Sequence, residues 1–281
     1  MRWSDREEST NIQDIRGGSG GRFKLGIGGV VLVVAIALLT KQNPLTLLNQ
    51  VSGSQDGGST KEYVPSAHEE ELRKFTAVTL KDTEVVWHDI FKKMGREYKE
   101  PVLVMFTDQV QSGCGLADAG MGPFYCGNDD KVYIDLSFYD LMKQRFGAKG
   151  DFAQAYVIAH EVGHHVQDEL GTLDKVHELQ SHMSKSEANK YSVKLELQAD
   201  FYAGVWANHA QQMASLDEAD IQEALEAANA IGDDTLQQQA QGHVVPDAFT
   251  HGTSEQRMRW FMKGWRSGDI RDGDTFRAKE L

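Results

Sequence analysis

A helical H-E-x-x-H motif at residues 160–164 constrains this chain more than any other part of its sequence. In an α-helix His160 and His164 lie four residues apart and therefore share one face, so one divalent ion can bind both imidazoles. Glu161 follows the first histidine and can reach a water molecule beside that ion. The pattern predicts two metal ligands and a general base on one rigid element.

The residues around the motif favour a helix. Four apolar side chains repeat with helical spacing before His160, which is typical of a face buried against a core. They are Phe152, Ala155, Tyr156 and Ala159. We expect Asp151 to be the N-cap, and Gly171 follows the last predicted turn at Leu170.

A catalytic zinc ion requires a third protein ligand and one open position for water. The metzincin continuation of the motif is excluded, because Gln167 and Leu170 stand where it requires glycine and histidine. A second helical stretch at residues 187–206 carries Glu196 and Asp200 on one face. We expect Glu196 to be the third ligand to one Zn²⁺ ion per chain.

Asp200 has a different expected task at the metal centre. It can accept a hydrogen bond from the nitrogen of His160 that does not bind metal, which fixes the tautomer of that ring. The alternative for Glu196 is a solvated helix carboxylate paired with Lys190 or Lys194.

Three segments together resemble the bacterial "putative neutral zinc metallopeptidase" family. They are residues 160–167 (H-E-V-G-H-H-V-Q), 196–200 (E-L-Q-A-D) and 249–257 (F-T-H-G-T-S-E-Q-R). The resemblance covers nearly the whole chain. It implies a membrane-anchored zinc peptidase with a fold related to the gluzincins, in which a glutamate on a following helix completes the motif. It does not supply the physiological substrate.

The expected chemistry is hydrolysis of a peptide bond. Zinc held by His160, His164 and Glu196 makes its water acidic and polarises the scissile carbonyl. Glu161 then takes the proton of the water and passes it to the leaving amine.

His251 is the candidate donor to the developing oxyanion, because related gluzincins place a late histidine at this step. The neighbouring Gly252 permits an unusual backbone turn. Tyr202 is a weaker candidate donor. The structural alternative makes His251 a turn residue before the final helix, capped by Thr253 or Ser254. We expect Arg257 to hold an acidic partner in the core.

The fold class implied is α+β and zincin-like, mainly helical, with a small sheet that includes an edge strand. Residues 131–136 alternate apolar and polar side chains, and we expect them to form the edge strand that aligns substrate. The continuous apolar run at residues 102–106 predicts a central strand. A long helix is expected from Ala67, and a pair of helices at residues 217–241 with a break at Gly232.

Cys114 and Cys126 bracket a short loop. In a reducing compartment they are ordinary thiols, whereas in an oxidising one a disulfide here would contribute roughly 3 kcal/mol. A second zinc site is not expected, because partner ligands are absent nearby in the sequence.

The N-terminal region predicts a membrane anchor. Residues 25–40 are sixteen uncharged, mostly apolar residues bounded by Lys24 and Lys41. A cleaved signal peptide is the alternative, but no small-x-small cleavage site follows the run. More basic residues precede the run than follow it, which predicts a cytoplasmic N-terminus. We therefore expect a single-pass protein of the bacterial inner membrane with its catalytic domain in the periplasm, where the disulfide would form.

The expected organisation has four parts. They are a basic cytoplasmic tail at residues 1–24, a transmembrane helix at 25–41, a linker at 42–66 and a metallopeptidase domain at 67–281. Residues 42–281 carry 23 basic and 38 acidic residues, a net charge of −15. Such a surface repels nucleic acid and anionic lipid, so the expected partners are a peptide or protein substrate and the membrane through the N-terminal helix. The sequence does not indicate the oligomeric state.

Two other functional classes compete with a peptidase. One is a catalytically silent, membrane-tethered binding module with a zinc site, and the intact Glu161 argues against it. The other is a metal-storage or metal-sensing protein, which is disfavoured because the ligands form one site and no histidine-rich tract exists elsewhere.

Overall fold

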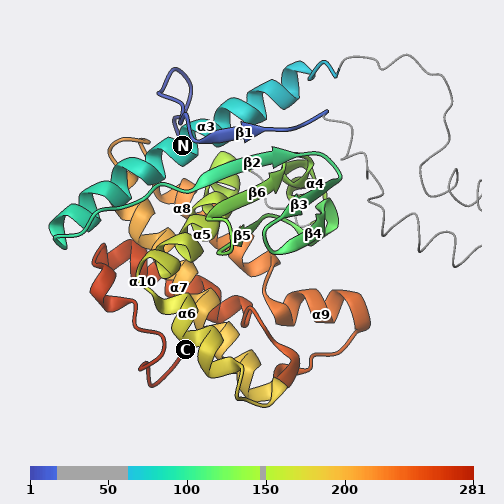
Figure 1. Cartoon of the computed structure of the whole chain (residues 1–281), viewed down its shortest axis with the longest axis vertical. Helices are drawn as coiled ribbons and strands as arrows, with labels where there is room; N and C mark the ends of the chain where they lie inside the picture. The colour runs from blue at the N-terminus through green and yellow to red at the C-terminus, as the bar shows by residue number, and fades with distance from the viewer. Residues whose placement is uncertain (18–62, 146–149) are drawn as a thin grey trace, which may run out of the picture. The chain divides into compact units, whose positions relative to one another are not determined.

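The computed structural model describes residues 1–17, 63–145 and 150–281. Within these residues four strands form a sheet in the order β1-β2-β6-β5, and β3 and β4 form a separate hairpin (Figure 1). The strands are β1 (Ile12–Asp14), β2 (Val102–Phe106), β3 (Gln109–Ser112), β4 (Gly115–Asp118), β5 (Phe124–Cys126) and β6 (Lys131–Asp135). β1 and β6 run parallel to β2, and β5 runs antiparallel to β6.

Helices supply most of the remaining described chain. They are α3 (Ala67–Lys93), α4 (Ser137–Arg145), α5 (Asp151–Glu169), α6 (Thr172–Gln180), α7 (Lys185–Ala210), α8 (Glu218–Ala230), α9 (Asp233–Gln241) and α10 (Ser254–Ser267). Three short 3₁₀ helices lie at η1 (Ala119–Met121), η2 (Pro246–Ala248) and η3 (Ile270–Asp272). The expectation of a mainly helical α+β fold with a small sheet is confirmed.

Both faces of the sheet are covered. Leu103 and Met105 of β2 point into the main core with residues of α3, α5 and α7. Their neighbours Val104 and Phe106 point to the other face, into a smaller cluster with Val110 of β3 and Ala117 of β4. Because β2 is apolar on both faces and lies between β1 and β6, the prediction of a central strand at residues 102–106 is confirmed.

The predicted edge strand was wrong. Residues 131–135 form β6, which lies between β2 and β5, and the two edges of the sheet are β1 and β5. The alternating side chains of β6 are buried rather than solvated. Tyr133 stacks on Phe124 with ring centroids 4.8 Å apart, and Asp135 accepts hydrogen bonds from the backbone N–H groups of Asp108 and Ser137. Alternation therefore reflects a second, partly polar core here and not an exposed edge.

The first 15 residues pack against the domain expected at residues 67–281. Residues 1–15 and 65–281 form one compact unit. β1 adds to the sheet beside β2, although its three residues are too short to produce a strand pattern in the sequence.

The predicted membrane anchor at residues 25–41 and all but the last residues of the linker at 42–66 lie outside the described residues. Within the described ranges, no helix is long and apolar enough to span a membrane.

Two glycines allow α7 and α10 to cross closely. A Cβ atom on Gly204 would lie 2.1 Å from the carbonyl oxygen of Phe261, and one on Gly264 would lie 2.1 Å from that of Phe201. Each helix therefore uses a glycine where the backbone of the other passes. The crossing places the start of α10 over the middle of α7, where the candidate site lies.

The helix boundaries agree with the predictions except at one cap. The N-cap of α5 is Gly150, with φ of 122°, and Asp151 is the first helical residue. Gly171 follows the helix with φ of 68°, as its position after Leu170 predicts. The acidic run forms α8 and α9 with Gly232 between them, which confirms the predicted helix pair.

Candidate metal centre and cleft

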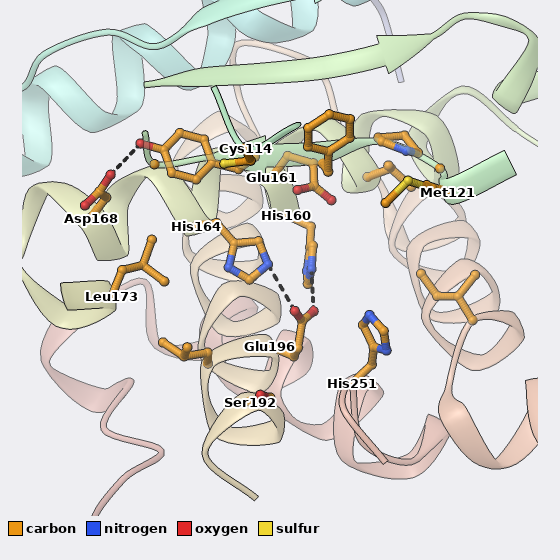
Figure 2. A pocket seen from close by; sticks show the side chains of 18 of the residues that line it. Cys114, Met121, His160, Glu161, His164, Asp168, Leu173, Ser192, Glu196 and His251 are labelled. Carbon is orange, nitrogen blue, oxygen red and sulfur yellow. Dashed lines mark hydrogen bonds and ion pairs between the residues drawn. The ribbon is translucent and has the colours of Figure 1, made fainter. Parts of the chain in front are cut away.

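Helices α5 and α7 bring the three predicted ligands together. The Nε2 atom of His160 lies 3.1 Å from Oε2 of Glu196, and Nε2 of His164 lies 3.4 Å from Oε1 of the same carboxylate (Figure 2). All three ligand atoms lie within 4.8 Å of one another. Lys194, one of the alternative partners for Glu196, bonds instead to the carbonyl oxygen of Phe276.

Gly163, inside the H-E-x-x-H motif, sets the distance between the two helices. A Cβ atom at this position would lie 2.9 Å from the carbonyl oxygen of Ala199 on α7. A glycine here lets α5 approach α7 closely enough for one carboxylate to face both imidazoles.

The Nδ1 atoms of His160 and His164, which face away from Glu196, each lie within hydrogen-bond distance of an acceptor. Nδ1 of His160 lies 2.8 Å from Oδ1 of Asp200, and Nδ1 of His164 lies 2.9 Å from Oε1 of Gln167. A proton on each Nδ1 leaves both Nε2 lone pairs directed at the space beside Glu196. Two imidazoles and one carboxylate form a donor set that fits zinc, and Asp200 and Gln167 fix the tautomers of the two imidazoles.

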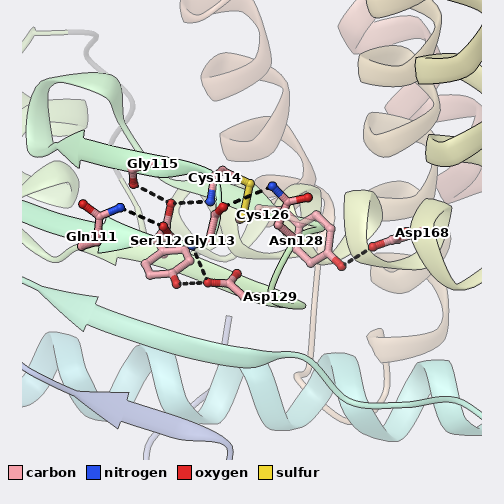
Figure 3. Close-up of a disulfide and its surroundings, with 11 residues drawn as sticks. Gln111, Ser112, Gly113, Cys114, Gly115, Cys126, Asn128, Asp129 and Asp168 are labelled. Carbon is pink, nitrogen blue, oxygen red and sulfur yellow. Dashed lines mark hydrogen bonds between the residues drawn. A yellow bond between two sulfur atoms is a disulfide. The ribbon is translucent and has the colours of Figure 1, made fainter.

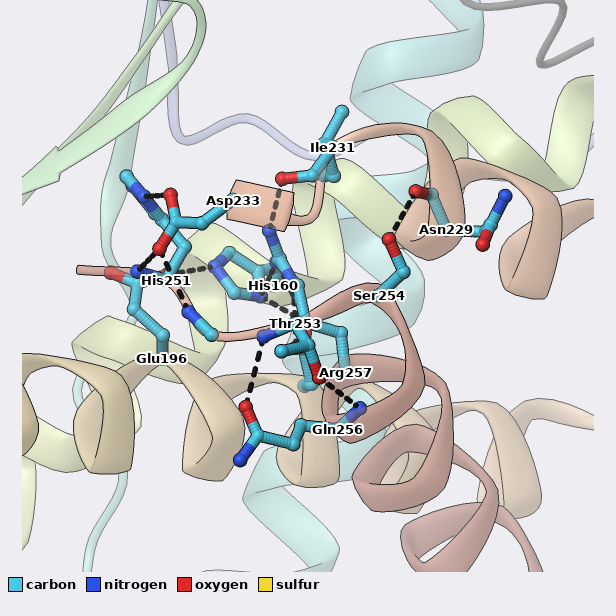
Figure 4. Close-up of polar contacts among 12 residues, drawn as sticks. His160, Glu196, Asn229, Ile231, Asp233, His251, Thr253, Ser254, Gln256 and Arg257 are labelled. Atoms are coloured by element: carbon cyan, nitrogen blue, oxygen red, sulfur yellow. Dashed lines mark hydrogen bonds and ion pairs between the residues drawn. The ribbon is translucent and has the colours of Figure 1, made fainter. Parts of the chain in front are cut away.

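Asp200 is the centre of a buried polar network that includes His160 and Arg257, and Figure 4 shows these two residues close together. The two oxygens of Asp200 accept from Nε and Nη2 of Arg257 at 2.9 and 3.0 Å, and the hydroxyl of Tyr156 donates to Asp200 at 2.5 Å. The guanidinium also reaches the carbonyl oxygen of Ile231. The expectation that Arg257 holds an acidic partner in the core is confirmed, and that partner is the residue behind His160.

Charge pairing dominates the protonation of these buried groups. Burial works against the charged form of Asp200, but Arg257 and His160 outweigh it and lower the pKa of Asp200 to about 2. Burial likewise opposes charge on His160, yet Asp200 and Glu196 raise the pKa of that imidazole to about 10 in the metal-free protein. The pKa of Glu196 is held well below its usual range, because His164 and His160 overcome the cost of its burial.

Glu161 lies beside the three donors without being one of them. Its side chain is 8% exposed and lines the same cavity (Figure 2). Burial raises its pKa, with the nearby histidines working in the opposite direction. A carboxylate with a raised pKa at this position is suited to accepting a proton.

His251 stands on a loop that is held by Asp233. One oxygen of Asp233 accepts from the backbone N–H groups of Thr250, His251 and Gly252, and the other lies 3.2 Å from Nδ1 of His251. Gly252 has φ of 90°, the turn for which a glycine was expected. The hydrogen bond and the charge of Asp233 raise the pKa of His251.

The imidazole of His251 lines the cavity and lies near Glu196 (Figure 2). Thr253 is the N-cap of α10 with a capping box, so the predicted capping of the final helix is also present. The position of His251 is therefore compatible with a donor at the site as well as with a turn before α10.

The whole chain can now be compared with known proteins. Residues 1–276 match the protein family described as "Putative neutral zinc metallopeptidase". The chain belongs to this family.

The chain has relatives in Escherichia coli and in Mycobacterium tuberculosis. It is 49% identical to "Uncharacterized protein YpfJ" of Escherichia coli K12 over 284 residues, which cover 98% of this chain and 99% of that protein. It is 41% identical to "Uncharacterized protein Rv2575" of Mycobacterium tuberculosis over 203 residues, or 68% of each chain. No solved structure matches the chain.

A cavity of about 870 Å³ lies over the candidate metal centre. On one side of the three donors lie Asp168 and Leu173, and on the other lies Met121 (Figure 2). Apolar side chains that line the cavity include Pro123, Phe138 and Leu141. Phe124 and Tyr125 of the edge strand also line the cavity, so β5 borders the cleft.

A disulfide joins the hairpin to this edge strand. Cys114, between β3 and β4, is bonded to Cys126 at the end of β5, with Cα atoms 5.8 Å apart (Figure 3). Asp129 and Asn128 add hydrogen bonds to the backbone of Gly113 on the hairpin side. The disulfide expected for an oxidising compartment is present and lies at the wall of the cleft.

The polar contacts of three residues at the candidate site were not predicted from the sequence. Tyr156 was interpreted only as part of an apolar face, Gln167 only as a departure from the metzincin pattern, and Asp233 was not singled out. The spacing of Gln167 three residues after His164 could have indicated its contact. Tyr202, considered as an oxyanion donor, was a wrong candidate, because it is buried in the core against Trp87 at 5.7 Å between ring centroids.

Proposed function

We propose that this chain is a zinc-dependent peptidase that hydrolyses peptide bonds in the cleft between β5 and helices α5 and α7. The observation that carries the proposal is the arrangement of His160, His164 and Glu196 around one point, with Glu161 in the same cavity. Membership of a family described as zinc metallopeptidases supports it.

The ligands in this proposal are Nε2 of His160, Nε2 of His164 and a carboxylate oxygen of Glu196. When bound there, zinc supplies Lewis-acid chemistry, which makes water acidic near neutral pH and polarises a carbonyl. Asp200 and Gln167 keep the two imidazoles in the orientation that binding requires.

Glu161 is the proposed general base and acid. It accepts a proton from the attacking water and returns it to the amine that leaves when the C–N bond breaks. Because its pKa is raised, Glu161 is better suited than a solvated carboxylate to take up and return a proton. His251, in its protonated form, donates to the oxyanion that develops on the carbonyl oxygen.

The substrate is proposed to be a peptide in extended conformation that pairs with β5. This strand has a neighbour on one side only, and two of its residues line the cavity. Asp168 with Tyr125 borders one end of the cleft and the exposed Met121 borders the other, so the two ends differ in polarity.

We further propose that the domain works outside the cytoplasm while attached to a membrane. The disulfide between Cys114 and Cys126 supports an oxidising compartment, and the apolar run at residues 25–40 supports attachment.

The proposal is tested by measuring zinc content and peptide cleavage together. The wild-type protein is expected to bind one zinc ion per chain and to cleave members of a peptide library. Glu161→Gln should keep the zinc and lose at least about a hundredfold in kcat, the usual contribution of a general base. Glu178→Gln changes an exposed glutamate on α6 and should behave like the wild type.

One outcome would overturn the peptidase proposal. If the protein binds zinc but cleaves no peptide in a Glu161-dependent manner, the domain is instead a zinc-containing binding module.

A further inference from the structure

The N-terminal segment, residues 1–15, is bound into the domain through its backbone. β1 pairs with β2 in parallel, with Ile12 opposite Leu103 and Asp14 opposite Met105. The N–H of Leu103 donates to the carbonyl oxygen of Asn11 at 2.9 Å. Without this segment, β2 would lose its neighbour on that side of the sheet.

Polar side chains of the segment also pair with buried carboxylates of α3. Asp82 is 2% exposed and forms an ion pair with both terminal nitrogens of Arg6. Glu84 is 1% exposed and accepts hydrogen bonds from Ser9 and Asn11. A buried carboxylate that loses its partners is strongly destabilising, so α3 requires the segment.

A third set of contacts reaches the helix that carries the metal-ligand motif. Trp3 packs edge-to-face on Phe75 of α3 with ring centroids 5.6 Å apart. Its indole N–H donates to the first residue of α5, Asp151, at 2.8 Å. The segment therefore contacts the sheet, α3 and the start of α5 at separate points along its length.

These contacts conflict with a chain whose N-terminus and domain lie on opposite sides of a membrane. A bilayer core is roughly 30 Å thick, far beyond the reach of any hydrogen bond or ion pair. The order of the sequence makes the conflict direct, because the apolar run lies between the segment and α3. A single crossing there would separate β1 from β2 and Arg6 from Asp82.

We propose that residues 1–15 and residues 65–281 lie on the same side of any membrane to which this protein is attached. The proposal replaces the predicted arrangement in which the N-terminus is cytoplasmic and the domain lies on the opposite side of the membrane. The count of basic residues on each side of the apolar run treats Arg6 as a free charge, whereas the folded domain pairs Arg6 with Asp82. The proposal does not depend on peptidase activity.

Labelling of single cysteines in cells tests the shared side directly. Ser4→Cys reports on the segment and Leu179→Cys on the domain, since both positions are exposed. Each variant of the full chain is treated with a membrane-impermeant maleimide in intact spheroplasts and again after permeabilisation. The parent chain, with its two cysteines in the disulfide, gives the background. We expect the ratio of intact to permeabilised labelling to agree between the two variants.

If one position labels in intact spheroplasts and the other only after permeabilisation, the proposal is overturned. The agreement between the two ratios is the deciding quantity, so the test works whichever compartment contains the domain.

Crosslinking in the same cells tests whether the observed contacts exist there. Glu8 and Arg73 form an ion pair at 3.0 Å on the surface of the domain. A chain with Glu8→Cys and Arg73→Cys should be crosslinked by a short bismaleimide and migrate as a compact monomer on denaturing gels. The matched control combines Glu8→Cys with Met94→Cys, at the far end of α3 and about 30 Å from position 73 along the helix axis. Failure of the 8/73 pair to crosslink more than the 8/94 pair would contradict the proposal.

Discussion

Asp233 accepts hydrogen bonds from three consecutive backbone N–H groups around His251, and its second oxygen faces the ring of the same histidine. One carboxylate thus shapes the loop and sets the charge of the imidazole. Asp233 is the first residue of α9, and His251 lies 18 positions further along the chain, after the end of that helix.

The first prediction concerns the alkaline limb of the pH–activity profile. The pKa of His251 is raised by its hydrogen bond to Asp233, so the donor form persists above the usual pKa of histidine. Activity that requires protonated His251 is lost as the pH rises through the raised pKa of this histidine. In Asp233→Asn the negative charge is removed, the pKa of His251 falls, and the alkaline limb of kcat should move to lower pH. Peptide-cleavage rates across pH measure the shift.

Asp234→Asn is the matched control for this loop. Asp234 also accepts a backbone N–H, but its oxygen is bonded to the N–H and the hydroxyl of Ser254 rather than to His251. An equal shift of the alkaline limb in both variants would show that loop disorder, and not the charge of Asp233, causes the effect.

The second prediction tests the spacing of α5 and α7. In Gly163→Ala the new methyl group must displace the backbone of Ala199, which moves Glu196 away from the two histidines. We expect zinc affinity to fall roughly tenfold or more, the size of effect that loss of ligand orientation causes. Competition with a zinc chelator of known affinity measures the change. Val162→Ala, which removes buried volume at the adjacent position, should lower stability but keep the zinc affinity near that of the wild type.

The third prediction concerns stability against pH. Burial raises the pKa of Asp82 to about 6, although Arg6 works in the opposite direction. The folded state therefore binds this proton more tightly than the unfolded chain does, and the stabilising effect of the protonated form is lost as the pH rises from about 4 to about 6. Asp82→Asn stays uncharged throughout. Relative to the wild type, its free energy of unfolding should increase by about 2 kcal/mol over this interval.

Urea unfolding of both proteins at several pH values measures this difference. A constant difference between pH 4 and pH 6 would show that Arg6 fully compensates the burial of Asp82.

The fourth prediction concerns the disulfide at the wall of the cleft. Replacing both Cys114 and Cys126 by serine should lower the free energy of unfolding by roughly 3 kcal/mol, because the bond closes a short loop of the unfolded chain. Wild-type protein unfolded in reductant should match the double-serine variant. Equal stability of the oxidised and reduced wild type would contradict the prediction.

The parts of the site that could be predicted are those encoded by local spacing. The positions of His160 and His164, and of Glu196 and Asp200, follow from the helical period, and the helices that carry them are long enough to show it. The contact between Arg257 and Asp200 was expected only as an unspecified acidic partner, because the distance of 57 residues between them leaves no local signal.

The parts that could not be predicted depend on neighbours distant in sequence. β1 and β5 have three residues each, too few for a periodic pattern. β6 alternates because the hairpin of β3 and β4 covers its second face, and nothing within residues 131–135 distinguishes that cover from solvent. Asp233 lies at the start of a short acidic helix, where an aspartate is usually explained by the helix dipole alone.

Glu196, Asp200 and Gly204 follow one another on α7 at intervals of four residues, so the candidate ligand, the carboxylate behind His160 and the crossing with α10 lie along one stripe of a single helix. A single residue inserted between Glu196 and Gly204 would turn one end of this stripe by about 100° relative to the other. The metal centre would then lose its register with α10 even if every functional side chain were kept. Across the family, we therefore expect this stretch of α7 to change by substitution but to keep its length.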